Sequence, residues 1–235
     1  MIIEESVGVR RFTKRRTHWQ RALYLVLPAL LIFASTACPD DWQSLFDGKT
    51  LNGWHSPGNN QAGTTQSVNG HIPQRGSHPQ PCTTSEAKTT AWEKGAAHWE
   101  AVNGELRGCD AGPGYLTSDR SFKNFVLSVE FKALPDTNSG VFIRNGYEVQ
   151  IWTDQEAGYT TGAIVSVAKT AKHYDFKADE WNTMVISAEG DHMTVVLNGE
   201  KTLDTNDSKY ASGPIRLQYW DYPISFRNLK IRELP

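Results

Sequence analysis

The sequence is poor in features that mark several large classes of protein. Cysteine and methionine each occur three times in 235 residues, charged residues make up 21%, and the formal net charge is −2. Because no strongly positive run occurs in the body of the chain, a nucleic-acid binder of the usual basic kind is disfavoured. The sequence has no C-x-x-C or His/Cys cluster for structural zinc, and neither a dinucleotide fingerprint nor a phosphate loop.

Glycine and aromatic residues are abundant by contrast. The chain contains 19 Gly, 8 Trp, 8 Tyr and 9 Phe, which is typical of a turn-rich β protein rather than a helical one. Its length is enough for one sizeable core, so we expect residues 38–235 to form a single domain.

Residues 1–37 have the pattern of a secretory signal peptide. A basic stretch from Arg10 to Arg21 precedes an apolar run over residues 22–34, and small residues lead to Cys38. The run has 13 residues and contains Pro28, whereas a helix needs roughly 20 to span a bilayer, so a membrane-spanning anchor is less favoured. The sequence indicates export.

The end of this segment resembles the bacterial lipobox, in which the cysteine is lipidated. Ser35 stands where the lipobox usually has Leu, so secretion with cleavage near Ala37 is the alternative. The resemblance implies a lipid anchor on Cys38 and a location in the cell envelope, at the periplasm or outer membrane. In an oxidising compartment Cys82 and Cys109 can form a disulfide, although the sequence is equally compatible with its absence.

The segment 55–98 is poor in large aliphatic residues and rich in Gly, Pro, Thr, Ser, Gln and Asn. A loop of this length is unusual in a compact domain, so we expect a binding loop or an insertion tied down at Cys82. Its histidines have irregular spacing and are interpreted as solvated rather than metal-binding.

Short alternating runs follow from Trp99 onward. In 125–131 the odd positions are all apolar, which is the period of a half-buried strand. Asn198-Gly199 between two such runs predicts a two-residue hairpin. The sequence thus predicts an all-β jelly-roll sandwich of two antiparallel sheets. The further strands are expected at 140–144, 147–152, 163–168, 181–188, 192–197, 215–219 and 224–231.

Seven segments, taken in order, resemble the 3-keto-disaccharide hydrolase domain family. They are WQSLFDGKTLNGW (42–54), WEAVNGEL (99–106), NSGVFIR (138–144), GYEVQI (146–151), EWNT (180–183), LNG (197–199) and FRNL (226–229). The resemblance implies a concanavalin A-like lectin/glucanase jelly roll and cleavage of glycosides whose sugar carries a ketone at C3. The partner it implies is an oligosaccharide or glycoside substrate.

A ketone at C3 acidifies the hydrogen on C2, so a base can remove that proton and the glycosidic oxygen at C1 can leave by elimination. Water added later gives net hydrolysis. Such a site needs a base, an acid for the leaving group, and a cation or hydrogen-bond donors for the developing enolate.

The segment 147–152 is the best candidate for this site. On a strand, Glu148, Gln150 and Trp152 share one face, which places a carboxylate, an amide and an indole together. If Arg144 faces the same side, it could hold Glu148 ionised or stabilise the enolate. The alternative is an ion pair of Glu148 with Arg144 on a solvated face, with Trp152 as half-buried filler.

The chain also departs from the family pattern. A Leu-Gln segment is often followed by a His-Gly pair in the family, whereas Gln218 here leads into Tyr219 and Trp220. Either His173 substitutes as an acid or base from another loop, or the protein binds carbohydrate without cleaving it. Asn138, Gln218 and Trp220 complete the candidate substrate-binding set.

No metal ligand set can be assigned. Folds of this kind often hold calcium, and Asp136, Asn138 and nearby carbonyls could supply oxygen ligands for a divalent cation, although their segment is also an ordinary turn sequence.

Overall fold

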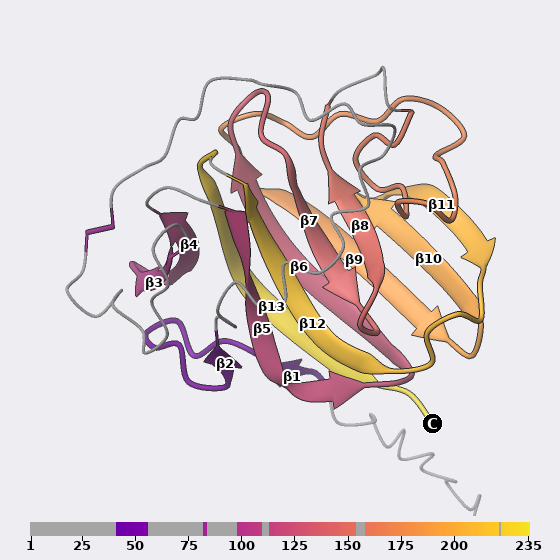
Figure 1. The fold of residues 1–235 in the computed structure, drawn as a ribbon, viewed down its shortest axis with the longest axis horizontal. Helices are drawn as coiled ribbons and strands as arrows, with labels where there is room; N and C mark the ends of the chain where they lie inside the picture. Colours follow the sequence, from indigo (N-terminus) through magenta and orange to yellow (C-terminus); the bar gives the residue numbers. More distant parts are fainter. Residues whose placement is uncertain (1–40, 56–81, 84–97, 110–112, 154–157, 221) are drawn as a thin grey trace, which may run out of the picture. The chain divides into compact units, whose positions relative to one another are not determined.

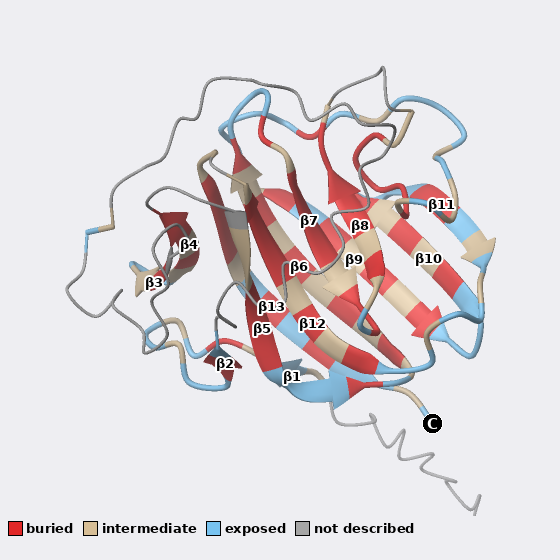
Figure 2. Ribbon diagram, viewed as in Figure 1, coloured by how far each residue is buried: buried red, intermediate tan, exposed pale blue. Residues whose placement is uncertain are grey.

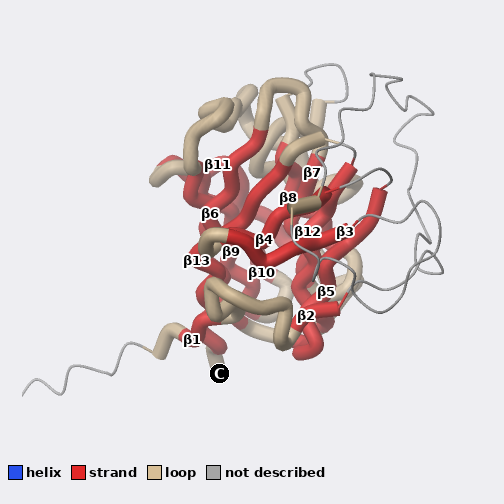
Figure 3. Tube along the Cα trace, turned by 90° about the vertical axis from the view of Figure 1, so that its left-hand side faces the viewer, coloured by secondary structure: helices blue, strands red, loops and turns tan. Residues whose placement is uncertain are grey.

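The computed structural model describes residues 41–55, 82–83, 98–109, 113–153, 158–220 and 222–235 (Figure 1). Every regular element in these ranges is a strand, as the tube in Figure 3 shows, so the all-β class expected from the sequence is confirmed. None of the described residues forms a helix long and apolar enough to cross a membrane. The proposed signal segment, Cys38 and most of 55–98 lie outside these ranges.

The strands form two antiparallel sheets that stack as a jelly-roll sandwich (Figure 1). The larger sheet has eight strands in the order β11-β10-β9-β6-β13-β4-β3, with β1 beside β13. Its strands are β1 (Gln43–Ser44), β3 (His98–Val102), β4 (Glu105–Cys109), β6 (Phe125–Ala133), β9 (Asn182–Glu189), β10 (His192–Leu197), β11 (Glu200–Asn206) and β13 (Ile224–Glu233).

The smaller sheet carries the residues of most interest for function. Its order is β2-β5-β12-β7-β8. The strands are β2 (Trp54–His55), β5 (Pro113–Phe122), β12 (Gly213–Trp220), β7 (Ser139–Ile143) and β8 (Tyr147–Ile151).

Buried and less buried residues alternate along β6, β9 and β10, as the banded ribbon in Figure 2 shows. Buried and half-buried residues alternate without a break along β6, as its sequence period predicts. The core lies between the sheets, where Trp99 of β3 packs its ring 6.4 Å from that of Tyr219 on β12 and 6.2 Å from that of Phe226 on β13. Burial of this apolar layer is the main source of stability.

One turn predicted from the sequence is present, and one predicted strand is absent. Asn198 and Gly199 join β10 to β11 with φ values of 49° and 85°, as expected for an Asn-Gly hairpin. The strand expected at 163–168 is absent, and the prediction was wrong. Ser166 has φ 61° and reverses the chain, so that Ile164 donates its amide to Ala168 and makes only single bridges to Ala168 and Val149.

Candidate functional site

A polar row crosses the outward face of the smaller sheet. The strand register pairs Thr117 with Arg216, Arg216 with Phe142, and Phe142 with Glu148. These four side chains, which we call the Glu148 row, therefore lie on one face across β5, β12, β7 and β8. That face points away from the core, because the neighbours in sequence, such as Val141, are completely buried between the sheets.

A second row lies beside the first. Tyr115 pairs with Gln218, and Gly140 pairs with Gln150. Each of these residues is two positions along its strand from a member of the Glu148 row, so it shares the same face. We call these four residues the Gln150 row. The aromatic ring of Tyr115 meets that of Phe142 edge to face at 5.1 Å, which joins the two rows.

A third set lies just beyond the Gln150 row. Trp220 is the last residue of β12, while Asn138 and Trp152 immediately precede β7 and follow β8. Trp220 and Asn138 are half-buried. Trp152 is 8% exposed, and its backbone is fixed at both N–H and C=O by the Thr161 hydroxyl. Trp220 is therefore more accessible for stacking on a ligand than Trp152.

The carboxyl group of Glu148 is unusual in its environment. It is half-buried, and no hydrogen bond or ion pair to its side chain occurs within the described ranges. Burial raises the pKa of Glu148 to about 8 because the charged form loses hydration. A carboxyl group with such a pKa exchanges its proton near neutral pH, which suits a general base or acid.

Polar atoms without partners concentrate on this same face. Four buried side-chain atoms of the described residues lack a hydrogen bond, and three of them are Thr117 Oγ1, Arg216 Nε and Gln218 Oε1. The fourth, Trp99 Nε1, lies in the core. Buried polar atoms are nearly always paired, so this concentration makes the face a candidate site for a polar ligand.

Tyr115 links the charged groups of the face. Burial raises the pKa of its phenol above the usual value of 10, and the nearby Glu148 charge acts in the same direction. The amide of Gln218 donates to the phenol oxygen and the Arg216 charge favours the phenolate, so both oppose this rise in pKa. Tyr115 consequently keeps its proton at neutral pH while lying within electrostatic reach of both Glu148 and Arg216.

The structure corrects the interpretation of Arg144. This residue is 1% exposed, with φ 47° at the turn after β7. Its guanidinium donates Nε–H to the carbonyl of Lys123 at 2.7 Å and Nη1–H to that of Gly190 at 2.5 Å. The pairing of Arg144 with Glu148 that the sequence left open does not form, because these carbonyls hold the guanidinium.

His173 lies in the loop between β8 and β9. Its Nε2 contacts Asp175 Oδ1 at 2.7 Å, and none of the described contacts joins it to Glu148. The structure thus gathers Glu148, Gln150 and Gln218 on one face with Trp220, and supplies no contact that brings His173 to them. A role for His173 as an acid or base stays a prediction.

Sequence reasoning missed Tyr115, Thr117 and Arg216. The signal for Arg216 was present, since it lies two residues before Gln218 on the same strand and must share its face. Tyr115 and Thr117 alternate with Leu116 in the same way. Which strand lies next to which could not be read from the alternation, because β12 and its neighbours β5 and β7 are far apart in the sequence.

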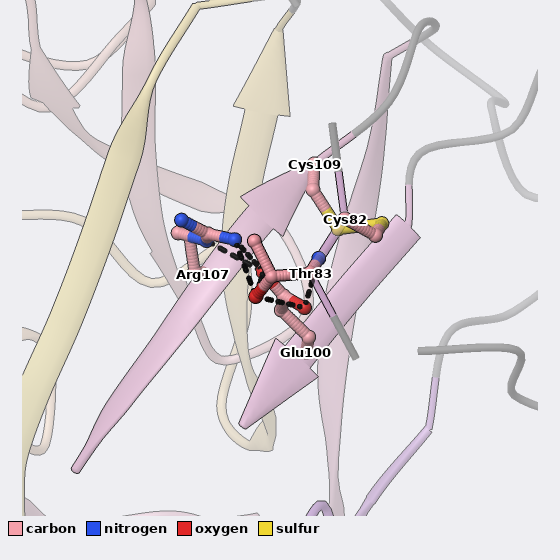
Figure 4. Close-up of a disulfide and its surroundings, with 5 residues drawn as sticks. All are labelled: Cys82, Thr83, Glu100, Arg107 and Cys109. Carbon is pink, nitrogen blue, oxygen red and sulfur yellow. Dashed lines mark hydrogen bonds and ion pairs between the residues drawn. A yellow bond between two sulfur atoms is a disulfide. The ribbon is translucent and has the colours of Figure 1, made fainter. Parts of the chain in front are cut away.

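A second polar cluster lies beside the disulfide, outside this face (Figure 4). Cys82 and Cys109 are bonded, in the pairing considered from the sequence. Thr83 donates its amide to the buried carboxylate of Glu100 at 2.8 Å, and Arg107 Nε donates to the same carboxylate at 2.6 Å. The cluster fixes residues 82–83 to β3 and β4, which is a structural role.

The described residues offer no ready metal site. No group of three or more His, Cys, Asp or Glu side chains among them is arranged to hold an ion. The turn that carries Asp136 and Asn138 is closed by backbone, with the amide of Thr137 donating to the carbonyl of Leu134 at 3.2 Å. A cation site at Asp136 and Asn138 stays a prediction.

Comparisons with known proteins agree with this architecture. The model of the 3-keto-alpha-glucoside-1,2-lyase-like domain family matches residues 41–232. A provisionally named glycosyl hydrolase from Parabacteroides distasonis ATCC 8503 is 27% identical, with a TM-score of 0.51, covering 58% of this chain and 90% of that one. A second from the same organism is 16% identical, with a TM-score of 0.57, covering 83% and 94%. A comparison with curated proteins finds no match.

Proposed function

We propose, because this chain belongs to the 3-keto-alpha-glucoside-1,2-lyase-like domain family, that it cleaves glycosides and oligosaccharides whose sugar carries a ketone at C3. Family membership indicates a carbohydrate-related function. The observation that carries the finer proposal is Glu148, a carboxyl group with a pKa of about 8 on the edge strand β8 of the outward polar face. A weak carbon acid such as the C2 hydrogen of a 3-keto sugar requires a base of that kind.

The reaction is an elimination across C1 and C2. The base takes the C2 proton, and the C2–H electron pair forms an enolate with the C3 oxygen. The enolate then expels the oxygen on C1, which leaves with a proton, and a double bond forms between C1 and C2. Addition of water to this product gives net hydrolysis, so elimination and hydrolysis share the first step.

Different residues of the polar face act as base, as acid and as binding groups in this scheme. Glu148 is the base in its ionised form, and Tyr115 is the acid that protonates the leaving oxygen, because its phenol remains protonated at neutral pH. The amides of Gln150 and Gln218 are placed to bind sugar hydroxyl groups, since Gln218 Oε1 has no partner. Asn138 and Trp220, beyond the Gln150 row, are placed to hold the aglycone, with Trp152 supporting them.

A non-catalytic carbohydrate-binding protein of the same fold is the alternative. It is favoured by the absence of the His-Gly pair after Gln218, where the chain continues with Tyr219 and Trp220. Unpaired polar atoms beside aromatic rings serve binding as well as catalysis. Only turnover separates the two functions.

Export and lipid anchoring at Cys38 belong to the same proposal. They are supported by the basic and apolar segments of residues 1–37 and by the small residues before Cys38. An envelope location matches a substrate that arrives from outside the cell. Metabolic labelling with a fatty acid, lost in Cys38→Ser, tests the anchor.

Leaving-group release from an aryl 3-keto-glucoside tests the activity directly. The purified protein should release the aryl group from the keto sugar and leave the unoxidised glucoside intact. Glu148→Gln should abolish release, whereas Glu189→Gln, at an exposed strand glutamate of the other sheet, should have no effect. Saturable sugar binding without release at high protein concentration would favour the binding alternative.

A further inference from the structure

The guanidinium of Arg216 is held at one end and open at the other. Its Nη2 donates to Asn145 Oδ1 at 2.6 Å, whereas its Nε is buried without any hydrogen-bond partner. Asn145 lies in the turn between β7 and β8 with φ 69°. An anchored guanidinium with one unused, buried N–H is a directed hydrogen-bond donor.

The surroundings of this N–H suit an anionic oxygen. Thr117, the next member of the Glu148 row, also has an unpaired buried hydroxyl oxygen. The described ion pairs include none between Arg216 and a carboxylate, so its charge is not neutralised by an acidic side chain within those ranges. Arg216 is half-buried with its Nε in the interior, and a cation in this state attracts a developing negative charge more strongly than a fully solvated one.

The position of Arg216 relative to Glu148 fits one sugar ring. The two residues lie in the same row, on β12 and β8, with Phe142 of β7 between them. Two strand spacings separate their backbones by about 10 Å. A pyranose ring placed over Phe142 would therefore have Glu148 at one side and Arg216 at the other.

We propose that Arg216 binds the C3 oxygen of the 3-keto sugar and stabilises the enolate formed when Glu148 removes the C2 proton. This inference rests on the proposed function and adds a cation that stabilises the developing enolate. As the proton leaves C2, negative charge moves to the C3 oxygen. The Arg216 Nε–H donates a hydrogen bond to this oxygen, and this bond is stronger to the enolate than to the ketone. Asn145 is a positioning residue, because it holds Nη2 and so fixes the direction of Nε.

Proton exchange at C2 isolates this step from departure of the leaving group. A 3-keto sugar with no exocyclic leaving group at C1, 1,5-anhydro-3-keto-glucitol, can form the enolate and return to the ketone. In D2O the C2 hydrogen is replaced by deuterium, and the loss of its NMR signal reports the rate. Tyr115→Phe should keep this exchange and lose aryl release, because the phenol acts only on the leaving oxygen.

Arg216→Gln should slow C2 exchange about 10²- to 10³-fold, the loss that follows removal of one oxyanion donor. Arg216→Lys keeps the charge without the anchored geometry, so its rate of C2 exchange should lie between those of Arg216→Gln and the wild type. Asn145→Gly suits the φ of 69° and removes only the amide, so it should lower kcat for exchange more than it raises KM. Arg120→Gln, at an exposed arginine of β5 paired with Glu233, is the matched control and should exchange at the wild-type rate.

Each outcome assigns the failure to one proposal. Wild-type protein that neither exchanges C2 hydrogen nor releases the aryl group would overturn the proposed function and this inference with it. Wild-type activity together with unchanged exchange in Arg216→Gln would overturn the role of Arg216 alone. If Arg216→Gln does not fold, wild-type exchange in both Arg216→Lys and Asn145→Gly would overturn it equally.

Discussion

The side chain of Glu148 lies across Gly140 on the neighbouring strand. A Cβ atom added at Gly140 would be 2.9 Å from both Cγ and Oε1 of Glu148, closer than such atoms can approach. Gly140 has no left-handed φ, so its importance lies in the space it leaves rather than in backbone freedom. The absence of a side chain on β7 allows the carboxyl group to occupy its buried position.

Gly140→Ala should therefore displace the Glu148 carboxyl and lower kcat/KM at least tenfold, with the pKa of Glu148 returning toward its ordinary value as the group gains solvent. The pH profile of kcat/KM measures both effects. Gly146→Ala is the matched control, because its Cβ would overlap the ring of Tyr210 rather than the side chain of Glu148. It should cost about 1–3 kcal/mol of stability and keep the profile. Equal profiles in the two variants would contradict the role given to Gly140.

The pH dependence of kcat/KM should follow the ionisation of Glu148. Because burial raises its pKa to about 8, the ionised base is the minor form at pH 6 and the major form at pH 9. We expect kcat/KM to rise about tenfold per pH unit up to about 8 and then level. Tyr115 stays protonated across this range, since its pKa lies above 10. A profile that falls through pH 8 would make Glu148 the acid instead.

Glu148→Gln should abolish activity and at the same time stabilise the folded protein at neutral and alkaline pH. The pKa of Glu148 rises from 4.5 to about 8 on folding, so the folded state binds the proton more tightly. The contribution of Glu148 to stability is then greatest below pH 4.5 and falls, by up to about 1.4 kcal/mol per pH unit, until pH 8. The variant lacks this loss. Chemical denaturation at pH 5 and pH 8.5 should show a stability advantage of Glu148→Gln that grows with pH.

The sequence predicted the class of fold because its strands are locally encoded. Alternation in β6 and the Asn198-Gly199 turn depend only on neighbours in the chain, and both are confirmed. The strand expected at 163–168 failed because its apolar residues form a tight turn at Ser166 rather than a ladder. Hydrophobicity alone does not distinguish these outcomes.

The candidate site was predicted only along single strands. Glu148 and Gln150 share a face because strand geometry requires it, and that part follows from the sequence. Arg144 was misplaced because its left-handed φ turns it out of the strand pattern and toward two carbonyls distant in sequence. Arg216 reaches the face through pairing of β12 with β7, a contact between segments more than 70 residues apart that no local pattern encodes.

Arg144→Met should reduce stability without changing the chemistry. The variant leaves the carbonyl oxygens of Lys123 and Gly190 without their donor, and each such loss of a charged hydrogen bond costs about 1.5–3 kcal/mol. Thermal unfolding should show the loss. The pH profile and the KM of the folded fraction should match the wild type, because the guanidinium does not contact Glu148. A shifted profile would restore Arg144 to the catalytic site.

Removal of the disulfide should loosen the region beside β3 and β4 more than the polar face. Cys82 and Cys109 close a separation of 27 residues, for which the chain-entropy relation gives about 3.5 kcal/mol. In Cys82→Ser/Cys109→Ser the covalent link is lost, while the contacts of Thr83 with Glu100 and Arg107 remain. We expect lower stability by denaturation and faster hydrogen exchange in β4, with C2 exchange of the 3-keto sugar retained. Loss of that exchange at a temperature where the variant is folded would show that the disulfide also positions β5, which begins four residues after Cys109 and carries Tyr115.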